Sequence, residues 1–436
     1  MKSIKKLFSR AAEGQFAKDT LLLTVGTVIA QLIPLLASLA LARLFDENDF
    51  GRFSVFMSAM SIITVVIALK YEMAIIPAKN KSTAVNVMVL SFLLSLAMGV
   101  LCLLVLFIAK TPLLKMLELE EFPYLLFLLP CSAIFYEIYT CFNEWCVRNR
   151  SFKQLSVSKI FNTLFIAVTS IILGLFGIKA VGLLYGQLIG QLLIVVYVLI
   201  SFFYRDKNEL KRVSKRRLQT VLVKNRSYPA YLIPSQLLNT FFGQLPVLLI
   251  TASFGVGIVG FFSFAIRILS TPVTMIATAI GDVFRKRIQA DRDTIGNSKV
   301  LFLKLLVVLF VIGAVGFLIL GIFAPFLFKL VFGERWYVSG VYVQFLVVGE
   351  FINFVASPFT GVYYIYNKKH VLLIWQIVYS VLTFLSIFLG CVVFKDIYIT
   401  LLLYCVARVL INLLSLVLTF SIAKKGIGNK TVVQPI

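Results

Sequence analysis

The sequence predicts an all-α polytopic membrane protein with about twelve transmembrane helices in two six-helix lobes. The first observation is composition: of 436 residues, 60% are hydrophobic and 14% are charged, whereas soluble domains average about 45–50% apolar and about 25% charged residues. The second is that apolar runs of about 20 residues, the length that crosses a bilayer, recur along the chain. The third is that basic residues concentrate in alternate connections between these runs.

Twelve apolar runs are long enough to cross the membrane as helices. The first begins at Thr20 and exceeds the about 7–15 apolar residues of a cleaved signal peptide, so we expect it to remain as the first span. The predicted spans are residues 20–43, 51–77, 84–109, 123–147, 155–176, 181–204, 229–254, 257–283, 300–323, 337–361, 371–394 and 397–423.

A polar and strongly basic segment, residues 205–228, separates the sixth span from the seventh. It divides the chain into a predicted N-terminal lobe, residues 1–204, and a C-terminal lobe, residues 229–436. A weak repeat supports this division: Gly51, Phe53 and Ser54 recur 209 residues later as Gly260, Phe262 and Ser263. An offset of six spans preserves orientation, so we expect pseudo-two-fold symmetry about the membrane normal. Such a short match also arises by chance in an apolar chain.

The distribution of Lys and Arg predicts the orientation in the membrane. Of 42 basic residues, 28 fall on the side that holds both termini and the 205–228 linker, and 7 fall on the opposite side. Basic residues are retained on the cytoplasmic side of membrane proteins. We therefore expect a multi-pass protein of the bacterial cytoplasmic (inner) membrane with both termini in the cytoplasm. This bias accounts for most of the net charge of +23 and makes nucleic acid an unnecessary partner.

Cysteine and histidine usage gives no sign of a metal site. The six cysteines lie in apolar runs without close CxxC spacing, and His370 is the single histidine. Small apolar filling of helices is the ordinary role of such cysteines. We expect no metal, no cofactor, no catalytic residues and no ATP-binding Gly-x-x-x-x-Gly-Lys motif.

Charged residues within predicted spans are candidates for function, because a charge at mid-bilayer costs at least about 2.5–3.5 kcal/mol. The strongest candidate is Arg267, which is flanked by apolar residues well inside the eighth span; Arg408 in the twelfth span is a second. A guanidinium that lines a cavity suits a pyrophosphate, to which it donates two parallel hydrogen bonds. A buried structural ion pair is the alternative for both arginines.

Other charges near the spans have more than one interpretation. Lys70 and Glu72 lie near the end of the second span; on one helix they would point about 200° apart and could not face each other, and snorkelling to the headgroups is as good an interpretation as cavity lining. Glu137 and Glu350 are candidates for ion coupling. Arg43 and Asp49 are candidate mouth or gate residues, with Arg43 expected to form a salt bridge there.

Four segments together resemble the Wzx-type O-antigen flippases, the polysaccharide-transporter branch of the multidrug/oligosaccharidyl-lipid/polysaccharide exporter superfamily. They are residues 41–54, the Lys70-Tyr71-Glu72 run through Pro77, residues 259–268 and residues 331–336. The resemblance implies two six-helix lobes around a central cavity and alternating-access flipping of an undecaprenyl-pyrophosphate-linked oligosaccharide for surface polysaccharide synthesis. It implies a cationic cavity of Lys70, Arg267 and Arg408 with Glu72 as partner. The implied partners are this anionic lipid-linked cargo, membrane lipids and polysaccharide assembly proteins.

Two alternatives remain open at this point. The runner-up is a cation-coupled small-molecule (drug) exporter of the same superfamily, whose cavity should be acidic and aromatic. A polytopic lipid-dependent glycosyltransferase or polymerase would use the outer carboxylates near Asp49, but such enzymes carry long outer loops, and every predicted outer segment here is short. The sequence leaves the sugars of the cargo, the coupling ion, the source organism and the oligomeric state undetermined.

Overall fold

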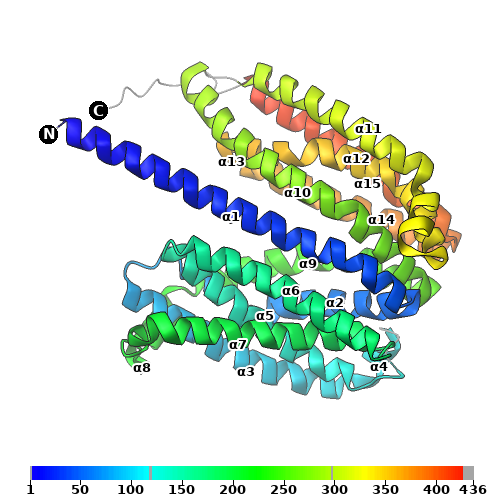
Figure 1. Ribbon diagram of the computed structural model, residues 1–436, viewed down its shortest axis with the longest axis horizontal. Coiled ribbons are helices and arrows are strands. Elements are labelled where there is room, and N and C mark those ends of the chain that lie inside the picture. The colour runs from blue at the N-terminus through cyan, green and yellow to red at the C-terminus, as the bar shows by residue number, and fades with distance from the viewer. Residues whose placement is uncertain (1, 117–119, 296–297, 426–436) are drawn as a thin grey trace. The chain divides into compact units, whose positions relative to one another are not determined.

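The structure is a computed structural model that describes residues 2–116, 120–295 and 298–425. All the regular secondary structure in these ranges is helical (Figure 1). The described chain contains twelve helical segments that are long and apolar enough to cross a membrane. The predicted fold class, all-α with twelve spans, is therefore confirmed.

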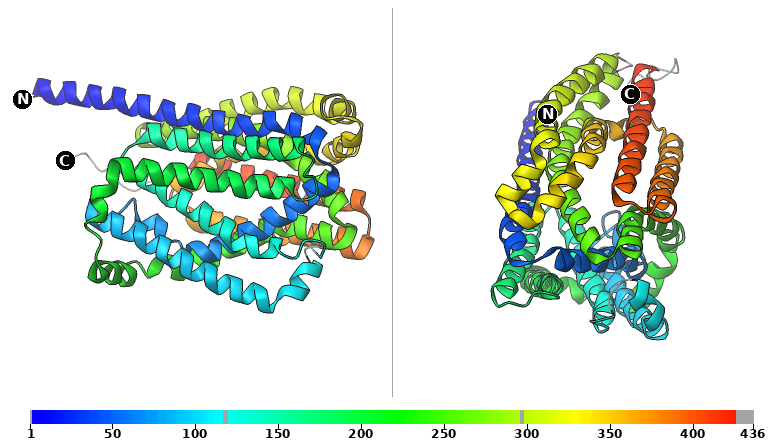
Figure 2. Two further views of the ribbon diagram at one scale, coloured as in Figure 1. Left: turned by 60° about the horizontal axis from the view of Figure 1, so that its bottom comes forward. Right: turned by 90° about the vertical axis from the view of Figure 1, so that its right-hand side faces the viewer.

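The chain forms two compact units, Met1–Gly260 and Phe261–Ile436. Within the first unit α1 packs along α6, α6 along α7, α2 and α3 against α5, and α2 against α9 (Figure 1, Figure 2). Its elements are α1 (Lys2–Leu44), α2 (Glu47–Ala68), η1 (Tyr71–Ala74), α3 (Lys81–Ile108), α4 (Lys110–Met116), α5 (Leu125–Arg148), α6 (Phe152–Leu175), α7 (Gly182–Leu210), α8 (Lys215–Lys224), α9 (Ser227–Phe254) and the start of α10 (Val256–Ile295).

In the second unit α12 packs against both α11 and α15, and α14 packs against α15. Its elements after α10 are α11 (Lys299–Phe332), η2 (Glu334–Trp336), α12 (Tyr337–Ala356), η3 (Ser357–Thr360), α13 (Gly361–Ile365), α14 (Lys369–Phe388), the π-helical turn η4 (Leu389–Phe394) and α15 (Ile397–Lys425). The tenth predicted span is thus three consecutive pieces, with Pro358 in the short 3₁₀ turn between two α-helices. Proline at this point removes a backbone donor and breaks the α-helical ladder.

The segment predicted as a polar linker is itself largely helical. Helix α7 continues to Leu210, and α8 follows as a short helix whose Val221 is buried in the apolar core of the first unit. Asn86 of α3 binds the turn before α8, since its amide donates to the Arg212 carbonyl and its oxygen accepts from the Ser214 backbone N–H. The lobe boundaries at residues 204 and 229 were predicted from the basic segment and the sequence repeat, whereas the first compact unit ends at Gly260. The predicted boundaries stay a prediction.

The two glycines of the sequence repeat lie at a close helix crossing in the first unit. A Cβ atom on Gly51 would lie 1.9 Å from the Val256 carbonyl oxygen, and one on Gly260 would lie 1.8 Å from the Glu47 carbonyl oxygen. Only residues without a side chain permit such an approach. The repeated motif therefore brings the first turns of α2 and α10 together, each glycine against the other helix.

Candidate functional site

A break in the helical ladder separates α2 from α3 and carries the first group of buried charges. Helix α2 ends at Ala68, and Leu69 and Lys70 both adopt left-handed backbone conformations with φ of 48° and 60° before η1 begins. This conformation costs a non-glycine residue about 1–2 kcal/mol. Two consecutive residues of this kind mark a locally strained segment, the helix break (residues 69–74), which functional sites often contain.

The helix break brings Lys70 and Glu72 together. The Lys70 ammonium Nζ lies 3.5 Å from Glu72 Oε1, and the two side chains are 14% and 4% exposed. The expectation that these residues cannot face each other was wrong, because it assumed a continuous α-helix through residue 72. The left-handed turn reverses their relative direction.

Glu137 of α5 completes an acid cluster with Lys70 and Glu72. Glu72 and Glu137 are 3% and 1% exposed, and their charges lie close enough to interact. The Cys141 thiol donates to Glu137 Oε1 at 3.3 Å, whereas Glu72 Oε2 is buried without a hydrogen-bond partner in the described part of the chain. One lysine therefore faces two carboxyl groups, so the cluster has a net negative charge unless it binds a proton or another cation.

Glu72 lies between the candidate spans that end at Ala68 and begin at Lys81. Burial, the largest effect, raises the pKa of the Glu72 carboxyl above its ordinary value, and the nearby Lys70 charge opposes part of that rise. The Glu72 carboxyl therefore binds a proton more readily than a carboxyl group in water does.

Contacts from other elements hold the helix break and the two residues that follow it. The Arg148 guanidinium at the end of α5 donates to the carbonyl oxygens of Ile75 and Ile76, at 3.2 and 2.7 Å. The Tyr71 hydroxyl donates to the Leu222 carbonyl oxygen of α8 at 3.2 Å. The linker helix is therefore hydrogen-bonded directly to the segment that carries the acid cluster.

The second buried group, the arginine pair, consists of Arg408 on α15 and Glu350 on α12. Arg408 Nη2 lies 2.7 Å from Glu350 Oε1, with side-chain exposures of 14% and 2%. Arg408 Nη1 also donates to the Tyr404 hydroxyl at 2.9 Å, and the Asn353 amide donates to Glu350 Oε2 at 3.2 Å. The charge of Arg408 is neutralised by its neighbour, which corresponds to the structural ion pair that sequence reasoning kept as an alternative.

Arg267 on α10 differs from the other buried bases. It is half-buried within a candidate span, and its guanidinium forms no ion pair or hydrogen bond with the described residues of the protein. Its charge therefore has no partner among the described residues. Of the two candidate arginines that the structure describes within spans of the second unit, Arg408 is paired and Arg267 is not.

The two predicted mouth residues have different roles. Asp49 is buried, and it forms a capping box with Asp46 in which each side chain accepts from the backbone N–H of the other at 3.0 Å. The expected salt bridge of Arg43 is not formed with any described residue, and Arg43 is exposed. Arg52 takes that place, 3.8 Å from Asp49 and 3.0 Å from Glu121.

Among the described residues, no three His, Cys, Asp or Glu side chains are placed to hold a metal ion. Sequence reasoning missed Cys141 and Arg148 as members of the site. Arg148 follows a predicted span, so in the sequence it counted only as one of the basic loop residues that predict the orientation. Nothing in the sequence distinguished Cys141 from the other cysteines in apolar runs.

Comparison with known proteins places this geometry in a family. The sequence profile of the family described as "Polysaccharide biosynthesis protein" matches residues 40–340. No curated protein matches the full sequence significantly.

Solved structures share the fold over most of the chain. The lipid II flippase MurJ in an inward closed conformation gives a TM-score of 0.74 at 12% identity, covering 92% of this chain and 87% of MurJ. An inward-facing multidrug resistance MATE transporter gives 0.67 at 17% identity, covering 89% and 93%. A transporter from Pyrococcus furiosus, described as having a binding pocket of reverse polarity, gives 0.59 at 17% identity, covering 92% and 94%.

Two of these structures are described as transporters of the MOP superfamily, and together with the two compact units of this chain the matches confirm the fold class predicted from the sequence. At this identity the structural likeness establishes the fold, and the profile match over residues 40–340 establishes the family. The chain is a multi-pass membrane protein that has the fold of the multidrug/oligosaccharidyl-lipid/polysaccharide exporter superfamily and belongs to the polysaccharide biosynthesis protein family.

Proposed function

We propose that this protein flips a lipid-linked anionic oligosaccharide across the bacterial cytoplasmic membrane for surface polysaccharide synthesis. The cargo that fits is an undecaprenyl-pyrophosphate-linked oligosaccharide, moved by alternating access with both termini in the cytoplasm. Family membership supports a role in polysaccharide synthesis, and the transporter fold supports movement of a substrate through the membrane. Polysaccharide assembly proteins are natural partners for such a step.

The observation that carries the proposal is the uncompensated guanidinium of Arg267. A charge within the membrane without a protein partner is tolerated where it faces water or a ligand of opposite charge. The planar fork of arginine donates two parallel hydrogen bonds and matches the oxygens of a pyrophosphate. Arg408 is a weaker candidate for this role, because Glu350 already occupies its fork.

The acid cluster supplies a candidate for coupling. Lys70, Glu72 and Glu137 together hold one positive and two potential negative charges in a buried place. Protonation removes the uncompensated charge, so the cluster can exist in two states that differ by one proton. We assign the coupling of transport to proton binding to Glu137 and Glu72 in preference to Glu350, which is paired with Arg408. Lys70 then acts as the ion-pair partner of Glu72 and is not a free basic residue of the cavity.

Replacement of Arg267 tests the proposal. Arg267→Ala should lower surface polysaccharide by roughly tenfold or more, since hydrogen bonds to a charged group contribute about 1.5–3 kcal/mol. The lipid-linked oligosaccharide should accumulate in the leaflet where it is made. Arg267→Lys, which keeps the charge but loses the fork, should recover activity only in part. Lys304→Ala, at an exposed basic residue of the same unit, is the matched control.

Unchanged surface polysaccharide in Arg267→Ala, at normal membrane expression, would remove Arg267 from the transport path. The second candidate function is a cation-coupled exporter of small cations, which the net acidity of the first unit's cluster favours. That function predicts drug sensitivity on deletion of the protein with unaltered surface polysaccharide, the opposite of the result expected for the flippase.

A further inference from the structure

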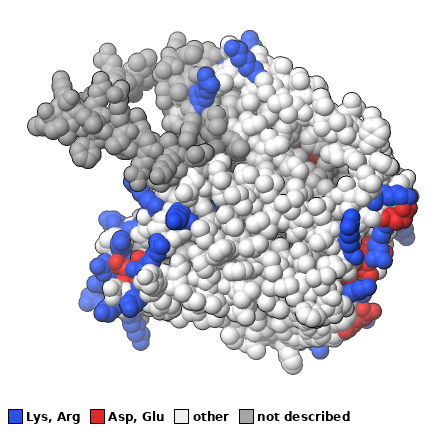
Figure 3. Space-filling model, in the orientation of Figure 1, with Lys and Arg blue, Asp and Glu red and all other residues white. Residues whose placement is uncertain are grey.

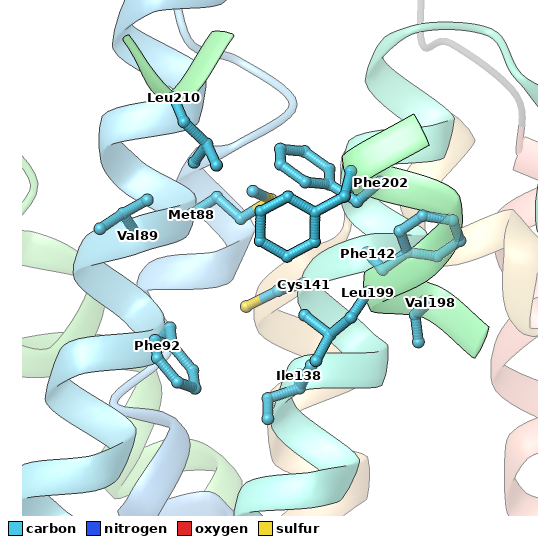
Figure 4. Close-up of a pocket in the computed structure, with 11 residues that line it drawn as sticks. Met88, Val89, Phe92, Ile138, Cys141, Phe142, Val198, Leu199, Phe202 and Leu210 are labelled. Carbon is cyan, nitrogen blue, oxygen red and sulfur yellow. The ribbon is translucent and has the colours of Figure 1, made fainter. Parts of the chain in front are cut away.

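The first unit contains an apolar pocket that the proposed transport site does not use. It has a volume of about 240 Å³ and is lined by eleven residues of α3, α5 and α7. Figure 4 shows side chains from the three helices converging on it, among them Met88 and Phe92 of α3 and Leu199 of α7. All the lining residues are hydrophobic, and Cys141 contributes the one sulfhydryl group.

The pocket opens to the exterior of the first unit. Three of its large apolar lining residues, Phe92, Leu199 and Phe203, are exposed by 39%, 43% and 51%. They belong to helices that are candidate membrane spans, so the surroundings of the pocket are hydrocarbon. An apolar recess between membrane-embedded helices suits one type of guest, a lipid hydrocarbon chain.

The end of the pocket is beside a dense group of basic residues. Leu210, the last residue of α7, lines the pocket, and Lys211 follows it directly. Lys207, Lys211 and Lys215 are exposed and form no ion pair with the described residues, whereas the neighbouring Arg212 pairs with Glu209 at 3.0 Å. Figure 3 shows Lys and Arg side chains gathered where Figure 1 places α8 and the adjoining end of α7, with few acidic side chains among them.

We propose that this part of the first unit is a binding site for one anionic phospholipid of the leaflet on the linker side. One acyl chain occupies the pocket between α3, α5 and α7, and the phosphate headgroup meets Lys207 and Lys211. Basic residues next to recesses between membrane helices are the recognised chemistry for anionic headgroups. The site is separate from Arg267, and it stands whether or not the cargo is a glycolipid.

The site has a direct structural link to the acid cluster. Cys141 lines the pocket and donates its thiol hydrogen bond to Glu137. On the other side of the linker, α8 carries the carbonyl oxygen that accepts from Tyr71 of the helix break. An acyl chain in the pocket and a headgroup on the linker therefore contact the two elements that position Glu137 and Glu72, so lipid occupancy stabilises one arrangement of the cluster.

Native mass spectrometry of the purified full-length chain tests the site. Delipidated protein is given phosphatidylglycerol or phosphatidylcholine with identical acyl chains. The wild type should retain one phosphatidylglycerol in preference to phosphatidylcholine. Lys207→Gln with Lys211→Gln should reduce that preference by roughly tenfold or more, since each base near an anionic headgroup contributes on the order of one kcal/mol.

Leu199→Trp fills the pocket and should abolish retention of that lipid. Leu193→Trp is the matched control, because Leu193 is exposed on the same helix and does not line the pocket, so retention should be unchanged. If Leu199→Trp fails to fold, the double variant Lys207→Gln with Lys211→Gln still tests the site, because both lysine side chains are exposed.

Equal retention of both lipids by the wild type, or retention unaffected by Leu199→Trp in a folded protein, overturns the proposal. A third arm adds undecaprenyl phosphate. If that carrier displaces phosphatidylglycerol and Leu199→Trp abolishes its binding instead, the pocket holds the chain of the transport substrate, and the phospholipid assignment is wrong.

Discussion

The acid cluster and the arginine pair solve the same physical problem in different ways. Both bury ionised groups among membrane-spanning helices, where an unpaired charge is costly. In the second unit Glu350 meets Arg408 one to one at 2.7 Å, and Asn353 and Tyr404 supply further hydrogen bonds, although Arg408 Nε is buried without a partner among the described residues. In the first unit Lys70 faces two carboxyl groups, and Glu72 Oε2 has no hydrogen-bond partner among the described residues.

The backbone that carries each group also differs: it is regular for the arginine pair and strained for Lys70 and Glu72. Glu350 and Arg408 project from the uninterrupted helices α12 and α15. Lys70 and Glu72 lie on the helix break, where two non-glycine residues adopt left-handed conformations. A balanced pair on rigid helices has one stable charge state, whereas an unbalanced group on a strained segment can change both its protonation and its conformation. We therefore propose a structural role for the arginine pair and a switching role for the acid cluster.

The largest expected effect comes from breaking the balanced pair. Arg408→Met leaves the Glu350 carboxylate buried without its partner and should lower the free energy of unfolding by about 3–5 kcal/mol. The double variant Arg408→Met with Glu350→Leu should recover most of that loss, because both charges are gone. Denaturant or thermal unfolding of the detergent-purified protein measures both. A single variant as stable as the wild type would contradict the structural role.

The next effect concerns pH and the acid cluster. Because burial raises the pKa of Glu72 in the folded protein above the about 4.3 of an unfolded chain, the folded state binds this proton more strongly. The stabilising contribution is fully present below the unfolded pKa and is lost as pH rises through the folded pKa. Glu72→Gln mimics the protonated form and should remove this part of the pH dependence.

The measurement is the Tm of the wild type and of Glu72→Gln between about pH 4 and about pH 8, a window that contains the unfolded pKa and extends above it. The Tm of the wild type should fall more across this window. Glu334→Gln serves as the control, since the Glu334 carboxylate is 77% exposed and its substitution should leave the profile of the wild type intact. Parallel profiles for the wild type and Glu72→Gln would show that Glu72 does not titrate within the cluster.

A third prediction tests whether the linker helix restrains the helix break. Tyr71→Phe removes the hydrogen bond to the Leu222 carbonyl oxygen while keeping the buried ring. The free energy of unfolding should fall by about 1 kcal/mol. Hydrogen exchange at the backbone amides of residues 69–76 should also become faster, and exchange in α12 and α15 should not change. Faster exchange in all three regions would indicate general destabilisation instead of local release.

The two groups also differ in how far the sequence could predict them. Hydropathy was sufficient to predict twelve spans, because the apolar length of each helix is a local property of the sequence. The orientation predicted from the basic bias stays a prediction. The positions of Arg408 and Glu350 within spans were visible, but their pairing was not, since it depends on how α12 packs against α15. Arg267 was singled out as a candidate from its apolar neighbours in the sequence. Only the structure shows that it has no partner among the described residues.

The helix break shows a different limit. Residues 66–72 contain no glycine or proline, the usual signals for the end of a helix. A continuous helix was therefore the reasonable expectation, and it gave the wrong geometry for Lys70 and Glu72. The break is imposed by distant groups: Arg148 binds the carbonyl oxygens that follow η1, and α8 accepts from Tyr71. Such tertiary restraints leave no mark in local propensity.

The smallest expected effect follows from that imposed strain. Leu69 has φ of 48°, and its side chain packs against the apolar core of the first unit, so Leu69→Gly is compared with Leu69→Ala, which loses the same packing. Relief of about 1–2 kcal/mol of left-handed strain, less about 0.5–1 kcal/mol of backbone entropy added to the unfolded chain, should leave Leu69→Gly more stable than Leu69→Ala by a few tenths of a kcal/mol to about 1 kcal/mol. At Leu93, which is exposed in the middle of α3, the order should reverse, with Leu93→Gly about 1 kcal/mol less stable than Leu93→Ala. Opposite orders at the two positions in matched unfolding curves would locate the strain at the helix break, and a Leu69→Gly variant that is less stable than Leu69→Ala would show that no such strain is stored there.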